Sequence, residues 1–124
     1  MKWSAIGAFT LALAVAIGAF GAHALDGRLD DYSKGVYETG VRYHFFHALG
    51  LLIVSVLPRI GVLAARRAGW VCGLLLAGIV LFSGSLYLLA VTGQRMLGAV
   101  TPFGGVAFIA AWVLLGIWLI PSRG

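Results

Sequence analysis

The sequence has few charged residues. Asp, Glu, Lys and Arg make up 10% of its 124 residues, whereas they make up about 25% of an average soluble domain. Hydrophobic residues make up 61% of the chain. A soluble domain of this length buries only about two thirds of its unfolded surface, so it could not hide so much apolar surface. The composition therefore predicts a single integral membrane domain, residues 1–124.

Cysteine and catalytic motifs are also scarce. Cys72 is the only cysteine, which excludes an intrachain disulfide, and we interpret it as a small buried hydrophobe. The chain lacks the GxSxG motif of serine hydrolases, and Gly104-Gly105 lacks the Lys and Ser/Thr of a phosphate-binding loop. We therefore expect no enzymatic activity and no catalytic residue.

The net charge of +5 does not indicate a nucleic-acid partner. The basic residues lie scattered at the ends of apolar segments, without the basic stripe and interleaved aromatics of a nucleic-acid-binding surface. Attraction to anionic lipid headgroups explains them more simply. The expected partner is the lipid bilayer, and a homo-oligomer is left open.

Four apolar runs are long enough to cross a bilayer, because a hydrocarbon core of about 30 Å takes about 20 helical residues. The predicted spans are residues 3–24, 41–64, 69–92 and 101–120. The first run also resembles a signal peptide, since Ala22-His23-Ala24 has the A-x-A form of a cleavage site. Its uncharged stretch exceeds the usual core of about 7–15 residues, which favours a retained helix.

Residues 26–42 are the polar part of the chain. Apolar residues recur there at three- and four-residue steps, which predicts an amphipathic helix in the membrane interface. Asp30 or Asp31 could cap its start, and Glu38 and Arg42 are spaced to pair. Gly35 and Gly40 argue against one unbroken helix. The predicted fold class is all-α: a four-helix transmembrane bundle with a short amphipathic interfacial helix between spans 1 and 2.

An even number of spans places both termini on one side of the membrane. Lys and Arg number five on the terminus side and four on the other, which favours cytoplasmic termini. The terminus side holds Lys2, Arg59, Arg66, Arg67 and Arg123, and the other side holds Arg28, Lys34, Arg42 and Arg95.

Four ordered motifs carry a resemblance to a known family. They are Gly18–His23, Gly40–Tyr43 with His47-Ala48-Leu49 after it, Leu81–Tyr87 and Val100–Val106. With these motifs the chain resembles the YgdD-like small integral membrane protein family, whose domain has no known function. The resemblance implies a multi-pass protein of the bacterial inner membrane with no established activity. Family members often carry glutamine where this chain has His44, which leaves His23 and His47 as the matching histidines.

The predicted topology brings several polar side chains toward one membrane face. His23 ends the first span, the second begins near Tyr43, Tyr87 lies near the end of the third, and Thr101 begins the fourth. We therefore predict one polar layer for binding or for a proton path. Its members are His23, Tyr43, His44, His47, Ser83, Tyr87 and Thr101.

Three readings of this layer stay open. The favoured one is structural: intramembrane polar groups must find partners whether or not they do chemistry. The leading function is accordingly non-enzymatic binding of lipid or a hydrophobic partner, with His23 and His47 as polar anchors. One alternative is a small transporter or channel subunit that moves protons or a small ion. The other is a metal- or haem-binding component, although no metal ligand set or cofactor is indicated.

Overall fold

The computed structural model describes residues 2–121. These residues fold into long helices, and no strand occurs among them. The elements are α1 (Lys2–His23), α2 (Asp31–Val56), a 3₁₀ turn (Leu57–Ile60), α3 (Ala65–Gly78), a π-helical turn (Ile79–Ser83), α4 (Gly84–Thr92), a second 3₁₀ turn (Arg95–Ala99) and α5 (Thr101–Leu119). The predicted all-α class is confirmed.

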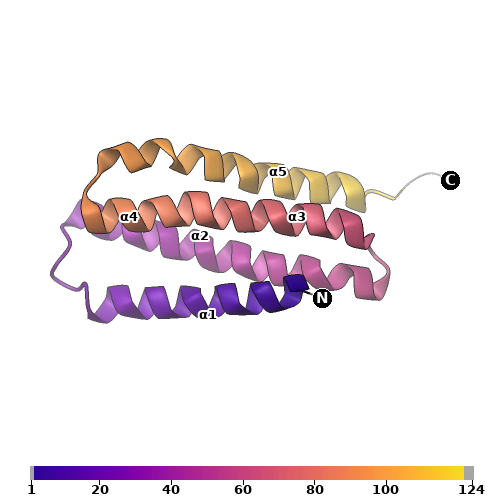
Figure 1. Ribbon diagram of the computed structural model, residues 1–124, viewed down its shortest axis with the longest axis horizontal. Helices are drawn as coiled ribbons and strands as arrows, with labels where there is room; N and C mark the ends of the chain where they lie inside the picture. Colours follow the sequence, from indigo (N-terminus) through magenta and orange to yellow (C-terminus); the bar gives the residue numbers. More distant parts are fainter. Residues whose placement is uncertain (1, 122–124) are drawn as a thin grey trace.

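Four helical segments within residues 2–121 are long and apolar enough to cross a membrane, which confirms the predicted four-helix architecture. They are Lys2–His23, Asp31–Ile60, Ala65–Thr92 and Arg95–Leu119. Figure 1 shows them side by side along the long axis, in the order α1, α2, α3–α4 and α5. The beginning of α1 and the end of α5 lie at the same end of the molecule, which we call the terminus end. The other end is the loop end. Arg123 lies outside the described residues.

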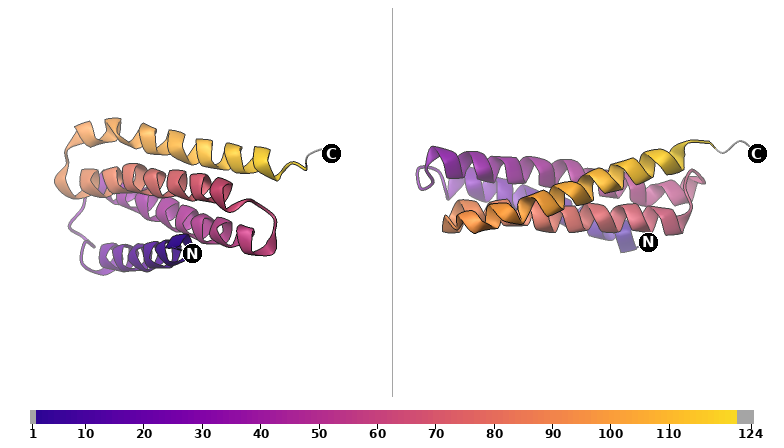
Figure 2. Two further views of the ribbon diagram at one scale, coloured as in Figure 1. Left: turned by 45° about the vertical axis from the view of Figure 1, so that its right-hand side comes forward. Right: turned by 90° about the horizontal axis from the view of Figure 1, so that it is seen from above.

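The central helices are α2 and the continuous α3–α4 helix, and the outer ones are α1 and α5. Protein contacts bury 44% of the apolar window in each central helix, but 11% in α1 and 17% in the segment that contains α5. Helix α1 packs along α2, and α5 packs on α3 and the π-helical turn, inclined to the α3–α4 helix (Figure 2). The core lies between the central helices, where Leu51, Leu75 and Cys72 are fully buried. The burial of Cys72 agrees with its interpretation as a small hydrophobe.

Helix α2 starts earlier than the sequence pattern predicts. The interfacial helix is expected over residues 26–42, but residues 31–42 form the first turns of α2 instead of a separate helix. Asp30 caps this helix, because its carboxylate accepts a hydrogen bond of 2.7 Å from the Ser33 N–H. That backbone hydrogen bond is the main cause that lowers the pKa of Asp30, and the charge of Arg95 lowers it further. The expected cap is therefore confirmed.

Gly40 does not break α2, because another helix packs at the place where its side chain would be. A Cβ at Gly40 would lie 2.8 Å from Cε1 of Tyr87 and 3.3 Å from Cβ of Leu86. The Ser83 hydroxyl donates a hydrogen bond of 2.7 Å to the Gly40 carbonyl. The missing side chain lets α4 approach α2 closely, and the packing offsets the low helix propensity of glycine.

The early start of α2 changes the depth of its histidines. His44 and His47 lie in the middle of a long helix rather than at its first turn. His44 contacts Thr10, which lies near the middle of α1, a helix of 22 residues and about 33 Å. The two histidines therefore lie in the middle of the bundle, deeper than the predicted polar layer.

Candidate functional site

His44 connects three helices in the middle of the bundle. Its Nε2 lies 2.9 Å from the carbonyl oxygen of Thr10 on α1, and its Nδ1 lies 2.8 Å from the hydroxyl of Tyr87 on α4. A carbonyl only accepts hydrogen bonds, so Nε2 carries the proton and Nδ1 accepts from Tyr87 when the ring is neutral. The side chain is 1% exposed. Both ring nitrogens have partners, as a structural histidine requires.

His47 lies in an aromatic cluster between α2 and α5. Its Nδ1–H donates a hydrogen bond of 2.8 Å to the Tyr43 carbonyl one turn earlier. The ring stacks on Phe108 at a centroid distance of 3.6 Å, with Tyr43 and Trp112 about 6 Å away. The missing side chain of Gly50 makes room for Trp112, since a Cβ there would lie 2.6 Å from the indole. Stacking and a bond within its own helix hold this ring in place.

The remaining residues of the predicted layer separate into different contacts. Ser83 bonds to the Gly40 carbonyl on α2, whereas Ser85 lies 2.6 Å from the hydroxyl of Thr101 on α5. His23 is the last residue of α1 and is exposed. The structure thus brings His44 together with Tyr87 and Tyr43 with His47, but His23 and Thr101 lie apart from both pairs.

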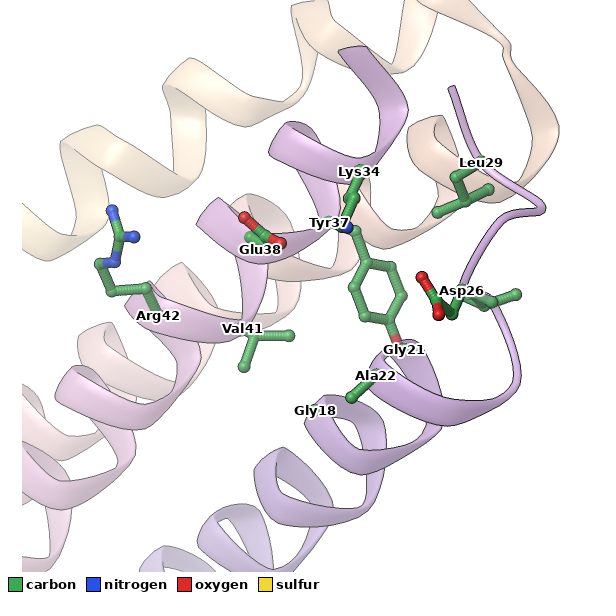
Figure 3. A pocket seen from close by; sticks show the side chains of 11 residues that line it. Gly18, Gly21, Ala22, Asp26, Leu29, Lys34, Tyr37, Glu38, Val41 and Arg42 are labelled. Atoms are coloured by element: carbon green, nitrogen blue, oxygen red, sulfur yellow. The ribbon is translucent and has the colours of Figure 1, made fainter. Parts of the chain in front are cut away.

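A different site lies at the loop end, between the end of α1, the connection to α2, and the first turns of α2. It is a cleft of about 440 Å³, which we call the α1–α2 cleft (Figure 3). None of the seven layer residues lines it. Its lining consists of Gly18, Gly21, Ala22, Leu25, Asp26, Leu29, Lys34, Tyr37, Glu38, Val41 and Arg42.

The rim of the α1–α2 cleft carries two positive and two negative side chains. Lys34, Glu38 and Arg42 follow one another at i,i+4 steps along α2, and Asp26 lies on the connection, on the side of Lys34 (Figure 3). All four are exposed. No ion pair within 4.0 Å joins them in the described part of the chain, so the expected Glu38–Arg42 pair does not form there. Their charges are available to a ligand.

The floor of the α1–α2 cleft is apolar and closed by Tyr37. Its hydroxyl donates a hydrogen bond of 2.5 Å to the Ile17 carbonyl, which ties α2 to α1. The ring occupies the space above Gly21, where any Cβ would overlap it. Leu25, Leu29 and Val41 line the sides and are half-buried. The cleft is therefore amphipathic, with charges at the rim and hydrocarbon below.

Within residues 2–121, no three His, Cys, Asp or Glu side chains lie close enough together to hold a metal ion. Sequence reasoning missed the α1–α2 cleft because it interpreted residues 26–42 as an amphipathic helix lying by itself in the membrane interface. The available signal was the i,i+4 series Lys34, Glu38 and Arg42 beside Tyr37 and Val41. A cleft needs two walls. The second wall is α1, and only the tertiary structure places α1 beside these residues.

Comparison with known proteins gives a family but no activity. Residues 17–105 match the family described as "Protein of unknown function (DUF423)". The chain is 52% identical over 112 residues to the "UPF0382 membrane protein YwdK" of Bacillus subtilis, with 89% of each chain covered. It is 47% identical over 110 residues to a UPF0382 membrane protein of Staphylococcus haemolyticus, covering 89% of this chain and 88% of the relative. A relative from Staphylococcus epidermidis is 46% identical over 119 residues, covering 96% and 95%. No solved structure matches the chain.

Proposed function

The chain belongs to the family of unknown function DUF423, whose relatives are named membrane proteins, and we propose that it is a non-enzymatic protein that binds a zwitterionic phospholipid in the α1–α2 cleft. One observation carries the proposal: the cleft joins a rim of unpaired charges of both signs to an apolar floor. A phospholipid has the same arrangement of polar and apolar groups, with a charged headgroup above its acyl chains.

The charge pattern selects the headgroup. The carboxylates of Asp26 and Glu38 would attract an ammonium group, and Lys34 and Arg42, which lie about 12 Å apart along α2, would attract a phosphate from either side. A purely anionic headgroup would gain two attractions but suffer two repulsions. A primary ammonium can also donate several hydrogen bonds to carboxylates, which a quaternary ammonium cannot. A phospholipid with a primary amine, such as phosphatidylethanolamine, therefore fits the rim best.

The depth of the cleft supports a lipid rather than a soluble zwitterion. Helix α1 is about one hydrocarbon thickness long, so its last turn lies at the membrane interface. The cleft spans this level, from Gly18 inside the last turns of α1 to Asp26 beyond them. A headgroup at the rim would leave its acyl chains beside Gly18 and Val41, in the lipid layer.

The histidines support this choice by their contacts. His44 already satisfies both ring nitrogens, and His47 is stacked among aromatic rings. They are therefore packing groups in our proposal, and the polar anchor is the rim of the cleft rather than the predicted His23 and His47. No specific contact favours the ion-path or haem alternatives.

Native mass spectrometry with added phospholipids tests the proposal. We expect the purified protein to retain phosphatidylethanolamine about threefold to tenfold more than phosphatidylcholine, because both lipids carry the same charges but only the primary ammonium can donate hydrogen bonds to the carboxylates. The double variant Asp26→Asn/Glu38→Gln should lose this preference and favour phosphatidylglycerol. The double variant Lys34→Gln/Arg42→Gln should retain less of every phospholipid with a phosphate headgroup.

Matched controls lie at the same end of the molecule outside the cleft. Arg28→Gln and Asp31→Asn change the same charges on exposed residues that do not line it. Both should bind lipid like the natural protein. The proposal is wrong if the natural protein retains the two zwitterionic lipids equally, or if the controls change lipid selectivity as much as the cleft variants do.

We also propose that the protein lies in the bacterial inner membrane with both termini cytoplasmic. The support is the Lys and Arg excess counted above, together with the basic segment from Arg59 to Arg67. We further infer the finer YgdD-like label within the family. The first three of its four motifs and most of the fourth lie within the matched residues 17–105.

A further inference from the structure

The terminus end carries a second hollow, between the first turn of α1 and the beginning of α3. This groove has a volume of about 520 Å³ and is lined by Trp3, Arg66, Gly69, Trp70, Gly73 and Leu74. We call it the Trp3–Trp70 groove. It lies at the opposite end of the molecule from the α1–α2 cleft, because α1 begins and α3 starts at the terminus end (Figure 1).

The two glycines form the floor of the groove. Cβ atoms built at Gly69 and Gly73 would lie 3.7 and 3.8 Å from the Trp3 indole, so the ring rests beside bare backbone. Leu74 and the exposed ring of Trp70 continue this apolar surface along α3. The length and apolarity of the surface suit an acyl chain.

The charged side chains at the terminus end have one sign within residues 2–121. All four acidic residues of the chain lie between positions 26 and 38, at the loop end. Lys2, Arg59, Arg66 and Arg67 lie at the terminus end without an acidic neighbour. This is the reverse of the α1–α2 cleft, where both signs alternate. An anionic headgroup is therefore attracted here without an opposing repulsion.

Arg66 is the cation that faces the groove. Its neighbour Arg67 instead lies 5.4 Å over the ring of Trp118 on α5, in a cation–π contact. Arg66 is exposed, and no ion pair or cation–π contact engages it within residues 2–121. The indole N–H groups of Trp3 and Trp70 likewise donate no hydrogen bond to that part of the chain. A planar guanidinium with indole donors beside it matches the oxygens of a phosphate.

We propose that the Trp3–Trp70 groove binds an anionic phospholipid, with its phosphate on Arg66 and an acyl chain over Gly69 and Gly73. This site is separate from the proposed function: it lies in the other leaflet and selects net negative charge instead of a zwitterion. The two sites would give the protein a different lipid preference at each end.

Native mass spectrometry with phosphatidylglycerol and phosphatidylcholine tests this site. The natural protein should retain phosphatidylglycerol preferentially, and Arg66→Gln should lower its occupancy about tenfold, as expected for the loss of a charged hydrogen-bonding partner. Arg66→Lys should restore part of the binding, because lysine keeps the charge but lacks the planar guanidinium that donates two parallel hydrogen bonds. The matched control is Arg28→Gln, which removes the same charge at the loop end and should have no effect.

A second variant tests the floor. Gly73→Leu would place a side chain in the groove and should lower phosphatidylglycerol binding while Arg66 is unchanged. Excess inorganic phosphate should not displace the lipid. The inference is overturned if phosphatidylglycerol binds no better than phosphatidylcholine, if Arg66→Gln and Arg28→Gln behave alike, or if inorganic phosphate competes and Gly73→Leu binds normally. The α1–α2 cleft would stand in each case, since its test compares phosphatidylethanolamine with phosphatidylcholine and changes the residues of its own rim.

Discussion

At the scale of the residue, His44 shows how a polar side chain can be accommodated in the middle of a bundle of apolar helices. It donates to the Thr10 carbonyl and accepts from the Tyr87 hydroxyl, so α1, α2 and α4 meet on one ring. No buried side-chain nitrogen or oxygen lacks a partner in residues 2–121. The cost of placing polar groups in hydrocarbon is thereby met within the protein.

A substitution series at His44 tests this structural role. Glutamine has one donor and one acceptor, so His44→Gln can keep both bonds and should change the free energy of unfolding by less than about 0.5 kcal/mol. His44→Leu removes both bonds and should cost about 1–2 kcal/mol, since interhelical hydrogen bonds in membranes are worth about 0.6 kcal/mol on average. Unfolding by SDS in mixed micelles measures both values. Equal stability of the leucine variant would contradict the structural role.

At the scale of the element, α2 depends on tertiary contacts at Gly40 but not at Gly35. Gly40 lies against Tyr87 and Leu86, whereas a Cβ at Gly35 would meet no atom within 4 Å. Glycine has the same low intrinsic helix propensity at both positions, so both residues lower the helix propensity of the segment. Packing therefore distinguishes two residues that local sequence treats alike.

Alanine at each position separates packing from propensity. Gly40→Ala should destabilise the protein by about 1–3 kcal/mol, because the new methyl group overlaps the Tyr87 ring. Gly35→Ala should stabilise it by about 0.5–1 kcal/mol, because alanine favours the helix and nothing opposes the added Cβ. Thermal unfolding in detergent compares the two variants. The close packing of α4 on α2 would be contradicted if both substitutions stabilised the protein.

At the scale of the whole molecule, the two ends differ in charge. The loop end holds every acidic residue and a mixed rim, and the terminus end is purely basic in the described residues. This difference bears on orientation, because basic segments are retained on the cytoplasmic side. It also separates the two proposed lipid sites, one in each leaflet.

Cysteine labelling in intact cells tests the proposed orientation. Arg28→Cys places a thiol in the connection between α1 and α2, and Val62→Cys places one in the exposed connection between α2 and α3. A membrane-impermeant maleimide should label Arg28→Cys in intact cells and Val62→Cys only after lysis. The native Cys72 is buried and should stay unlabelled. The opposite pattern would place the termini outside.

The sequence by itself determined the class of protein and the number of spans. Hydrophobic runs of sufficient length need no partner to be recognised, because the bilayer itself selects them. The Asp30 cap was predictable because capping depends on neighbouring residues in the sequence. The burial of Cys72 was predictable because it lies in an apolar run. The tertiary structure decided where α2 begins, how deep the histidines lie and where a cleft forms. Each of these depends on segments far apart in the chain: Tyr87 fills the space at Gly40, Thr10 meets His44, and α1 supplies the second wall beside Lys34 and Glu38.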